Sequence, residues 1–341
     1  MKSKKITKQL IVRIVVAIAL LGLLKIYLIF QHPVGDEKFS IYVRPTSTYA
    51  DVKEQMSQHA NLSSRFFFGV FSTVLGLENK LHEGCYEAKK GSSVWSLFTK
   101  MYRGRQTPVR LTFNNIRTKD QLAGRFGQQL MMDSVTLMTI FSNPDSCARW
   151  GFTPETIPAL FIPDTYEMYW NISYEKFMTK MKQAYDRFWT TERLEKAKQV
   201  GLSPVEISIL ASIVEEESNS VDERPAIAGL YLNRYRIGMP LQADPTVKFA
   251  VNNFSLRRIL FEHLKVDSPY NTYKNIGLPP GPIRVPSPAG IDAVLNYQHH
   301  DYLFMCAKYD FSGHHAFART MEEHHKNAQR YRNELDKRKI Q

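Results

Sequence analysis

The first thirty residues combine a basic segment with one long apolar stretch. Residues 1–9 carry four lysines and no acidic residue, and residues 10–30 are apolar apart from Arg13 and Lys25. As a helix this stretch would be roughly 31 Å long, about the thickness of the hydrocarbon core of a bilayer. Arg13 and Lys25 lie near its two ends, where long basic side chains can reach the membrane surface. The pattern predicts a transmembrane helix rather than the core helix of a soluble protein.

The charge beside this stretch predicts its orientation. Because basic residues flank the cytoplasmic side of membrane helices, we expect residues 1–9 in the cytoplasm and the chain after Phe30 on the opposite side. A cleaved signal peptide is the alternative. Residues 27–30 contain no small-x-small cleavage pattern, and the apolar run is long for such a peptide. The sequence therefore favours a single-pass anchor.

Residues 31–105 alternate between strand-like and helix-like patterns. Pro33 and Gly35 indicate a short linker over residues 31–37. We expect strands at residues 39–43 and 84–88, and helices at residues 50–59, 66–77 and 94–102. These elements predict a small α/β domain over residues 38–105.

Residues 106–341 predict a larger mixed α/β domain. The expected elements are a strand at 109–113, helices at 118–132, 175–200 and 289–296, and a hairpin of residues 302–308 and 315–318. The whole chain is thus expected to be an α+β protein with one N-terminal transmembrane helix, a small domain and a large one.

The segment from Ser203 to Ser218 has the most informative polar pattern. Ser203 and Glu206 fit a capping box with Pro204 at the first helical position, which predicts a helix running through residues 207–218. On a helical wheel one face carries Leu210, Ile213, Val214 and Glu217, and the other carries Ser208, Ser212, Glu215 and Glu216. On the second face we expect Glu215 and Glu216 to be solvated.

Glu217 is the acidic residue that continues the apolar face. A carboxylate that faces a core loses hydration, which disfavours its charged form and raises its pKa. A glutamic acid that holds its proton near neutral pH can donate it to the leaving oxygen of a glycosidic bond. The alternative is that Glu217 lies at a frayed helix end and turns to solvent.

Further polar side chains gather in the segments after this helix. Glu223 precedes a second helical pattern at residues 226–236, which ends before Gly238. Pro245 disfavours a helical conformation at Asp244 and predicts an extended or turn geometry there. The loops and the hairpin supply the candidate binding residues, which are Glu223, Gln242, Asp244, Thr246, Asn271, Tyr273 and His315. Each of them could instead satisfy backbone groups of its own loop.

The composition limits the classes of function. Hydrophobic residues make up 43% of the chain and charged residues 23%, which excludes a disordered protein. Six of the net twelve positive charges lie in residues 1–30, and three more lie in residues 319–341. The basic charge therefore indicates membrane topology, and we expect no nucleic-acid partner.

The cysteines and histidines do not predict a metal site. Cys85, Cys147 and Cys306 lack the CxxC spacing of zinc sites, and small buried residues are their default role. In an oxidising compartment two of them could form a disulfide, and their spacing does not decide whether they do. Paired histidines at 299–300, 314–315 and 324–325 point apart in a helix or strand. We expect no metal and no cofactor.

Several ordered motifs resemble those of the endolytic murein transglycosylases, the YceG-like family. They are Phe161–Tyr166, Leu210–Glu217, Glu223-Arg224, Leu232–Arg234, Gly238–Val247, Tyr270–Tyr273 and Gly277–Ile283. The resemblance covers residues 160–320, and the layout of one membrane helix, a small LysM-like domain and a catalytic domain is similar too. The family's essential glutamate aligns with Glu217, whereas Glu215 is the competing choice without that alignment.

The resemblance implies an activity and a location. Cleavage of peptidoglycan glycan strands between N-acetylmuramic acid and N-acetylglucosamine would leave 1,6-anhydromuramic ends, with Glu217 as acid and then base. The enzyme would act in cell-wall assembly, anchored in the cell (inner) membrane with residues 106–341 as an extracytoplasmic catalytic domain. Cell-wall synthases are implied as possible partners.

Two other functions remain open from the sequence. A peptidoglycan hydrolase would use water as nucleophile and Asp244 as second carboxylate. A catalytically silent wall-binding protein would need neither group.

Overall fold

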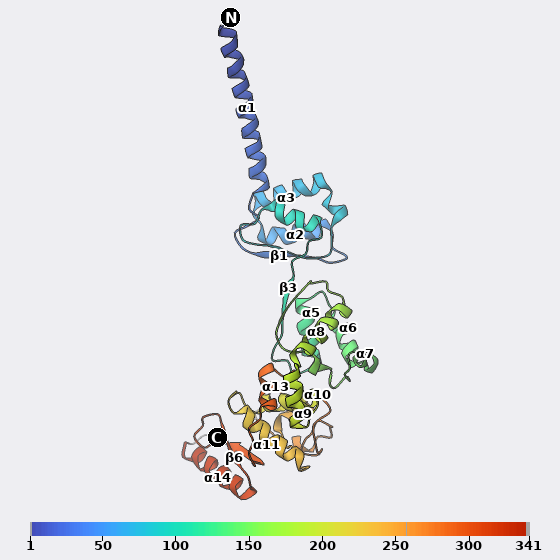
Figure 1. Cartoon of the computed structure of the whole chain (residues 1–341), viewed down its shortest axis with the longest axis vertical. Helices are drawn as coiled ribbons and strands as arrows, with labels where there is room; N and C mark the ends of the chain where they lie inside the picture. The colour runs from blue at the N-terminus through green and yellow to red at the C-terminus, as the bar shows by residue number, and fades with distance from the viewer. Residues whose placement is uncertain (1, 257, 339–341) are drawn as a thin grey trace. The chain divides into compact units, whose positions relative to one another are not determined.

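The chain forms a mixed helix and strand fold that divides into two compact units (Figure 1). This computed structural model describes residues 2–256 and 258–338. The first unit comprises residues 1–111, 129–131 and 167–172, and the second comprises residues 112–128, 132–166 and 173–341. The α+β class expected from the sequence is therefore confirmed.

The N-terminal helix α1 (Lys2–Phe30) contains the predicted apolar stretch. Its window Leu10–Phe30 has a mean hydropathy of 2.4 and is not buried against the rest of the chain. By length and composition this helix can cross a membrane, as expected from the sequence.

The rest of the first unit packs three helices around a two-stranded sheet. Its elements are β1 (Phe39–Val43), α2 (Tyr49–His59), α3 (Leu62–Leu75), the 3-10 turn η1 (Leu77–Lys80), β2 (Gly84–Ala88) and α4 (Val94–Tyr102). Strands β1 and β2 are antiparallel, with Ile41 opposite Tyr86. Helix α3 begins four residues earlier than predicted because the side chain of Asn61 caps it, accepting a 2.8 Å hydrogen bond from the Ser64 backbone N–H.

The expected linker at residues 31–37 is partly built into this unit. The backbone N–H of Val94 donates to the carbonyl of His32, and that of Val34 donates to the carbonyl of Ser92, each at 2.8 Å. Val34 is fully buried in the core. The chain that leaves α1 is therefore fixed to the unit that follows, because paired backbone groups and a buried side chain hold it there.

The second unit is mostly helical. Its helices are α5 (Lys119–Gln129), α6 (Ser134–Ser142), α7 (Pro144–Ala148), α8 (Tyr174–Phe188), α9 (Thr191–Val200), α10 (Pro204–Glu217), α11 (Arg224–Arg236), α12 (Asp244–Ala250), α13 (Pro288–Leu295) and α14 (Met321–Arg338), with 3-10 turns η2 (Ile157–Leu160) and η3 (His263–Lys265). Strands β5 (Phe304–Ala307) and β6 (His315–Ala318) form the predicted hairpin. Strands β3 (Val109–Thr112) and β4 (Thr165–Met168), which contain residues of both units, pair with each other.

The single helix expected over residues 175–200 is two helices. Helix α8 ends at Phe188 and α9 begins at Thr191. Thr190 has an extended backbone, and its hydroxyl accepts a hydrogen bond from the Arg193 N–H. A threonine cap ends one helix and starts the next, although the hydrophobic period continues across the break.

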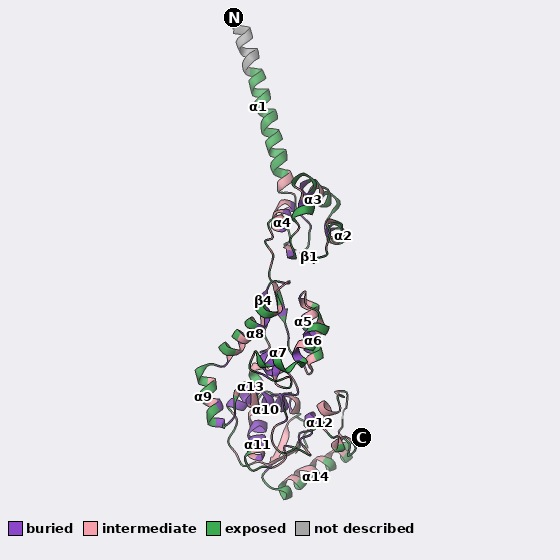
Figure 2. Ribbon diagram, turned by 90° about the vertical axis from the view of Figure 1, so that its right-hand side faces the viewer, coloured by how far each residue is buried: buried purple, intermediate pink, exposed green. Residues whose placement is uncertain are grey.

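Helix α10 lies in the core of the second unit, where Figure 2 shows it buried together with α11. The polar face of this helix is not exposed to solvent. Ser208 and Ser212 are fully buried and donate to the carbonyls of Pro204 and Ile209 in their own helix. Ser212 also accepts from the backbone N–H of Ile283. The polar side chains of this face are thus satisfied inside the protein rather than by water.

Candidate active site

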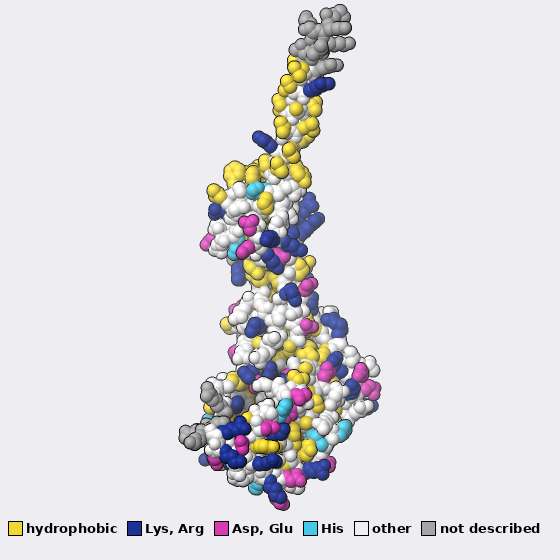
Figure 3. Space-filling model, turned by 90° about the vertical axis from the view of Figure 1, so that its left-hand side faces the viewer, with side chains coloured by type: hydrophobic (Ala, Val, Ile, Leu, Met, Phe, Trp, Pro, Cys, Tyr) yellow, Lys and Arg dark blue, Asp and Glu magenta, His cyan; other side chains and the backbone are white. Residues whose placement is uncertain are grey.

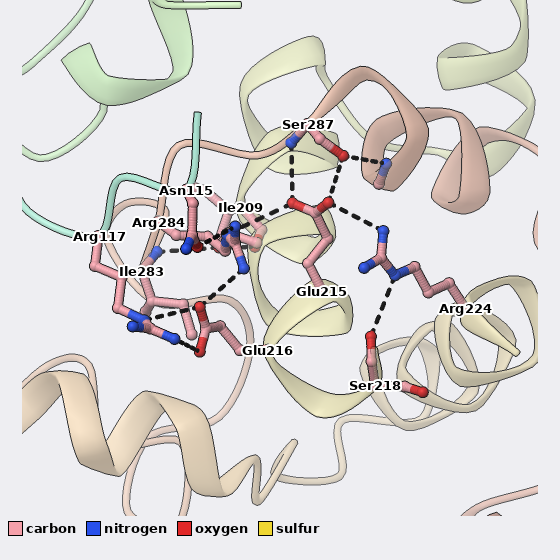
Figure 4. A network of polar contacts seen from close by, with 12 residues as sticks. Asn115, Arg117, Ile209, Glu215, Glu216, Ser218, Arg224, Ile283, Arg284 and Ser287 are labelled. Atoms are coloured by element: carbon pink, nitrogen blue, oxygen red, sulfur yellow. Dashed lines mark hydrogen bonds and ion pairs between the residues drawn. The ribbon is translucent and has the colours of Figure 1, made fainter. Parts of the chain in front are cut away.

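Three consecutive glutamates at the end of α10 have three different environments. Glu215 is buried at the start of α13, where its carboxylate accepts hydrogen bonds from both the backbone N–H and the hydroxyl of Ser287 (Figure 4). Arg224 donates to the same carboxylate at 3.1 Å, and Arg284 lies 3.7 Å from it. Glu215 therefore joins α10 to the N-terminus of α13, a position that favours a negative charge.

Glu216 is held by two arginines. Arg117 donates to both of its oxygens at 3.0 Å, and Arg284 donates to one of them at 3.0 Å (Figure 4). Arg284 also donates to the side chain of Asn115. The paired guanidinium geometry fixes the carboxylate and compensates its charge. The solvated role expected for Glu215 and Glu216 is therefore corrected: both form structural ion pairs.

Glu217 faces a cleft instead. The hydroxyl of Tyr231 on α11 donates a 2.5 Å hydrogen bond to its Oε1 atom. Loss of hydration, together with the nearby charge of Asp244, raises the pKa of Glu217 to about 7 against the opposing effects of Tyr231, His315 and Lys248. Glu217 can therefore hold and release a proton near neutral pH.

The cleft has a volume of about 210 Å³ and brings together most of the predicted site residues. Its lining includes Glu217 together with Gln242, Asp244, Tyr273 and His315. The remaining lining residues are Leu230, Tyr231, Arg234, Met305, Cys306 and Ala307. Segments from α10, α11, α12 and the β5–β6 hairpin thus converge on the carboxyl group of Glu217.

Asp244 is the first residue of α12, so the non-helical geometry expected for it is wrong. Pro245 occupies a position in the first helical turn, where a proline is tolerated because its missing N–H has no intrahelical partner. The hydroxyl of Tyr273 donates to Asp244 Oδ1 at 2.7 Å. Burial raises the pKa of Tyr273 above its usual range, and its bond to Asp244 adds to the shift. Tyr273 thus stays protonated and orients the carboxylate.

His315 is oriented by Glu223. One oxygen of the Glu223 carboxylate accepts the backbone N–H of His315 at 2.5 Å, and the other lies 2.9 Å from Nδ1. Glu223 is buried, whereas the His315 side chain is 18% exposed and lines the cleft. A carboxylate at Nδ1 favours a proton on that nitrogen. In the neutral ring Nε2 is then the nitrogen that can accept a hydrogen bond.

Besides Glu223, two further predicted binding residues lie outside the lining of the cleft. Thr246 is fully buried and bonds to the Ala243 carbonyl and the Thr272 hydroxyl. Asn271 is fully buried too, and its amide donates to the carbonyls of Leu264 and Val266. Both side chains fix the loops that carry Asp244 and Tyr273.

Sequence reasoning missed Tyr231 and Arg234 as parts of the cleft. Arg234 donates to the carbonyls of Leu303 and Leu241, each at 2.6 Å, and burial lowers its pKa. It therefore ties the β5 side of the cleft to the loop before Asp244. Arg234 belongs to a motif already singled out, Leu232–Arg234, whereas no local pattern marks Tyr231, which meets Glu217 through the packing of α11 on α10.

The cysteines are free, with Cys85 and Cys147 buried and Cys306 partly exposed. Across the described residues, no group of three or more His, Cys, Asp or Glu side chains is placed to hold a metal ion.

The profile of the YceG-like family matches residues 41–330. The chain belongs to the YceG-like family. This family's match includes the whole cleft and most of the first unit.

Curated relatives of this YceG-like chain carry the name endolytic murein transglycosylase. One, from Bacillus subtilis strain 168, is 38% identical over 156 residues, or 46% of this chain and 41% of the relative. Another, from Streptococcus pneumoniae strain D39, is 28% identical over 286 residues, or 72% of this chain and 50% of the relative. The chain spans about half the length of the curated relatives it matches.

A solved structure supports the family's fold along most of the chain. A YceG-like protein from Listeria monocytogenes superposes with a TM-score of 0.58 at 26% identity, covering 85% of this chain and 98% of that protein.

Proposed function

We propose that this chain is an endolytic peptidoglycan transglycosylase, a lyase that cuts glycan strands during cell-wall assembly. The observation that carries the proposal is the Glu217 carboxyl group, whose pKa is raised to about 7 in a cleft lined by polar side chains. The family and the names of the curated relatives support the same activity.

The proposed reaction breaks the β-1,4 bond between N-acetylmuramic acid and N-acetylglucosamine. Protonated Glu217 donates its proton to the glycosidic oxygen, which leaves as the 4-hydroxyl of N-acetylglucosamine while positive charge develops at muramic C1. The C6 hydroxyl of the same muramic residue then bonds to C1. Its proton goes to the Glu217 carboxylate, so the acid is restored and no water is consumed.

The other lining groups are proposed to hold the substrate. Asp244 stabilises the positive charge that develops on the sugar, and Tyr273 keeps this carboxylate in position. Gln242 and the free ring nitrogen of His315 bind hydroxyl or acetamido groups. Glu223 acts by orienting His315, and Thr246 and Asn271 act by fixing loops. Tyr231 orients Glu217 so that the other carboxyl oxygen carries the proton.

We propose a membrane location and a domain assignment as well. Helix α1 would anchor the chain in the cell (inner) membrane with residues 1–9 in the cytoplasm and both units outside. Residues 38–105 would form a LysM-like domain, since they follow the order β1–α2–α3–β2 with the two strands antiparallel. Residues 106–341 would form the catalytic domain. Cell-wall synthases are a proposed partner, because both would act on the same strands.

The identity of the nucleophile, which is either the muramic C6 hydroxyl or water, tests this function directly. Purified peptidoglycan is digested by the full chain in water enriched in ¹⁸O, and the fragments are analysed by mass spectrometry. We expect muramic ends one water lighter than reducing ends, with no ¹⁸O incorporated. Reducing ends that carry ¹⁸O would show attack by water and a hydrolase, and no fragments at all would indicate a binding protein.

A further inference from the structure

Helix α3 presents an apolar stripe to solvent. Leu62, Phe66, Val70 and Val74 follow one another at intervals of four residues, so they share one side of the helix. Their exposed fractions are 74%, 65%, 42% and 75%. The opposite side is packed in the core through Phe68 and Phe71. An apolar stripe of this size on an otherwise folded unit indicates a contact surface.

Helix α3 packs, through the side opposite the stripe, against the end of the membrane helix. The ring of Phe30, the last residue of α1, lies 5.3 Å from that of Phe71 on α3 and 4.6 Å from that of Trp95. The hydroxyl of Ser64 on α3 donates to the Pro33 carbonyl at 2.7 Å. Figure 3 shows hydrophobic side chains gathered on this unit around the end of α1. Helix α3 is therefore held beside Phe30, the residue at which the apolar stretch of α1 ends.

The charge of α3 suits a membrane surface. The helix contains no acidic residue, and its one charged residue, Arg65, is exposed. Basic side chains are attracted to anionic phospholipid headgroups, whereas acidic ones are repelled. Apolar residues on one side with a basic residue beside them are typical of helices that lie in the interfacial region of a bilayer.

We propose that α3 is a second membrane contact, lying in the interfacial layer of the leaflet that α1 reaches with Phe30. The 21 residues of Leu10–Phe30 span about 31 Å, which places Phe30 at the edge of the hydrocarbon core. A helix packed on Phe30 then lies at headgroup depth, where interfacial helices bury their apolar side by roughly 5–10 Å. The stripe of Leu62, Phe66, Val70 and Val74 enters the acyl boundary and is covered by phospholipid.

The proposal rests on α1 crossing the membrane, so the experiment tests both in one preparation. The full chain with Cys306→Ser is reconstituted in phospholipid vesicles containing an anionic lipid. An environment-sensitive fluorophore is attached to one introduced cysteine in each of four variants. They are Phe66→Cys and Val74→Cys in the stripe, Ile18→Cys in α1 and Glu54→Cys at an exposed position of α2. Quenching is measured with phospholipids spin-labelled on the acyl chain and with aqueous iodide. The parent protein corrects for labelling of Cys85 and Cys147, which are buried.

We expect lipid quenching at Ile18, Phe66 and Val74, and iodide quenching at Glu54. Quenching by lipid at Ile18 but by iodide at Phe66 and Val74 overturns the proposal while leaving the anchor intact. Protection of Phe66 and Val74 from both quenchers also overturns it, because a protein then covers the stripe. Absence of lipid quenching at Ile18 refutes the anchor, and the interfacial contact with it.

Discussion

At the residue scale, the carboxyl group of Glu217 has a tyrosine hydroxyl as its partner, while Glu215 and Glu216 have arginines. A guanidinium stabilises a carboxylate as an anion. Burial without such a cation has the opposite effect, and it raises the pKa of Glu217 to about 7. The difference in partner thus makes one of three adjacent glutamates suited to proton transfer.

The raised pKa of Glu217 makes the free energy of unfolding depend on pH. Because the folded pKa of about 7 exceeds the usual value, the folded state binds more protons than the unfolded state between about pH 4.5 and 7. The free energy of unfolding therefore falls as the pH rises through this window, by up to about 3 kcal/mol. We expect Glu217→Gln to remove this loss, so that the variant gains stability over the wild type above pH 7.

Urea titrations at pH 5 and pH 8 measure this effect, with Glu195→Gln on the exposed side of α9 as the matched control. The control is expected to follow the wild type at both values. An equal loss of stability in Glu217→Gln at both pH values would mean that Glu217 is ionised in the folded protein.

Tyr231→Phe tests the hydrogen bond to Glu217. The hydroxyl donates to the carboxylate and so favours its ionised form. Its removal is expected to raise the pKa of Glu217 and to move the alkaline limb of the activity profile upward by about one pH unit. The measurement is the rate of fragment release from peptidoglycan between pH 5 and 9. Tyr235→Phe, one turn further along α11, should leave the limb in place, and a downward move in Tyr231→Phe contradicts the assignment.

At the scale of elements, α10 and α13 approach each other at Gly290. A Cβ atom on Gly290 would lie 2.5 Å from Cδ of Glu215, whose carboxylate caps α13 through Ser287. We expect Gly290→Ala to cost about 1–3 kcal/mol of stability, because a side chain or the helix must move. Thermal unfolding compares it with Gly124→Ala in α5, where a Cβ meets no atom within 4 Å. That control should stabilise by up to about 1 kcal/mol, and equal shifts in both variants would rule out the close contact.

Helical periodicity was enough to place Glu217 on the apolar side of α10, because the period of a helix fixes which residues share a face. The fate of Glu215 and Glu216 could not be predicted in this way. Their partners Arg117, Arg224 and Arg284 come from other elements, and two of them lie far away in the sequence. Two local rules also conflicted at Asp244. A residue before proline disfavours a helical backbone, but proline is favoured in the first turn of a helix, and the second preference decides the geometry here.

At the scale of the whole molecule, the net charge of +12 divides by location. Six positive charges belong to residues 1–30, which contain the apolar stretch of α1 and its basic flank. The cleft itself has no excess of basic residues, since Glu217 and Asp244 line it together with Arg234. Helix α1 and the cleft lie in different units of the chain, so they can be separated experimentally.

Removal of residues 2–28 tests this separation. The truncated chain keeps Phe30 and its contacts with Phe71 and Trp95. We expect it to lose carbonate-resistant association with membranes, because only a transmembrane helix gives effectively irreversible insertion. Its rate of fragment release from isolated peptidoglycan should match that of the full chain. Carbonate-resistant association of the truncated chain would contradict the role of α1.

The most direct test of the account is digestion of purified peptidoglycan by Glu217→Gln beside the wild type and Glu195→Gln. Glutamine keeps the shape of the side chain but cannot donate or accept the catalytic proton. The account predicts no release of anhydromuramic fragments by Glu217→Gln, with an unchanged circular dichroism spectrum, and normal release by Glu195→Gln. Release at the wild-type rate by folded Glu217→Gln would contradict the central role of Glu217.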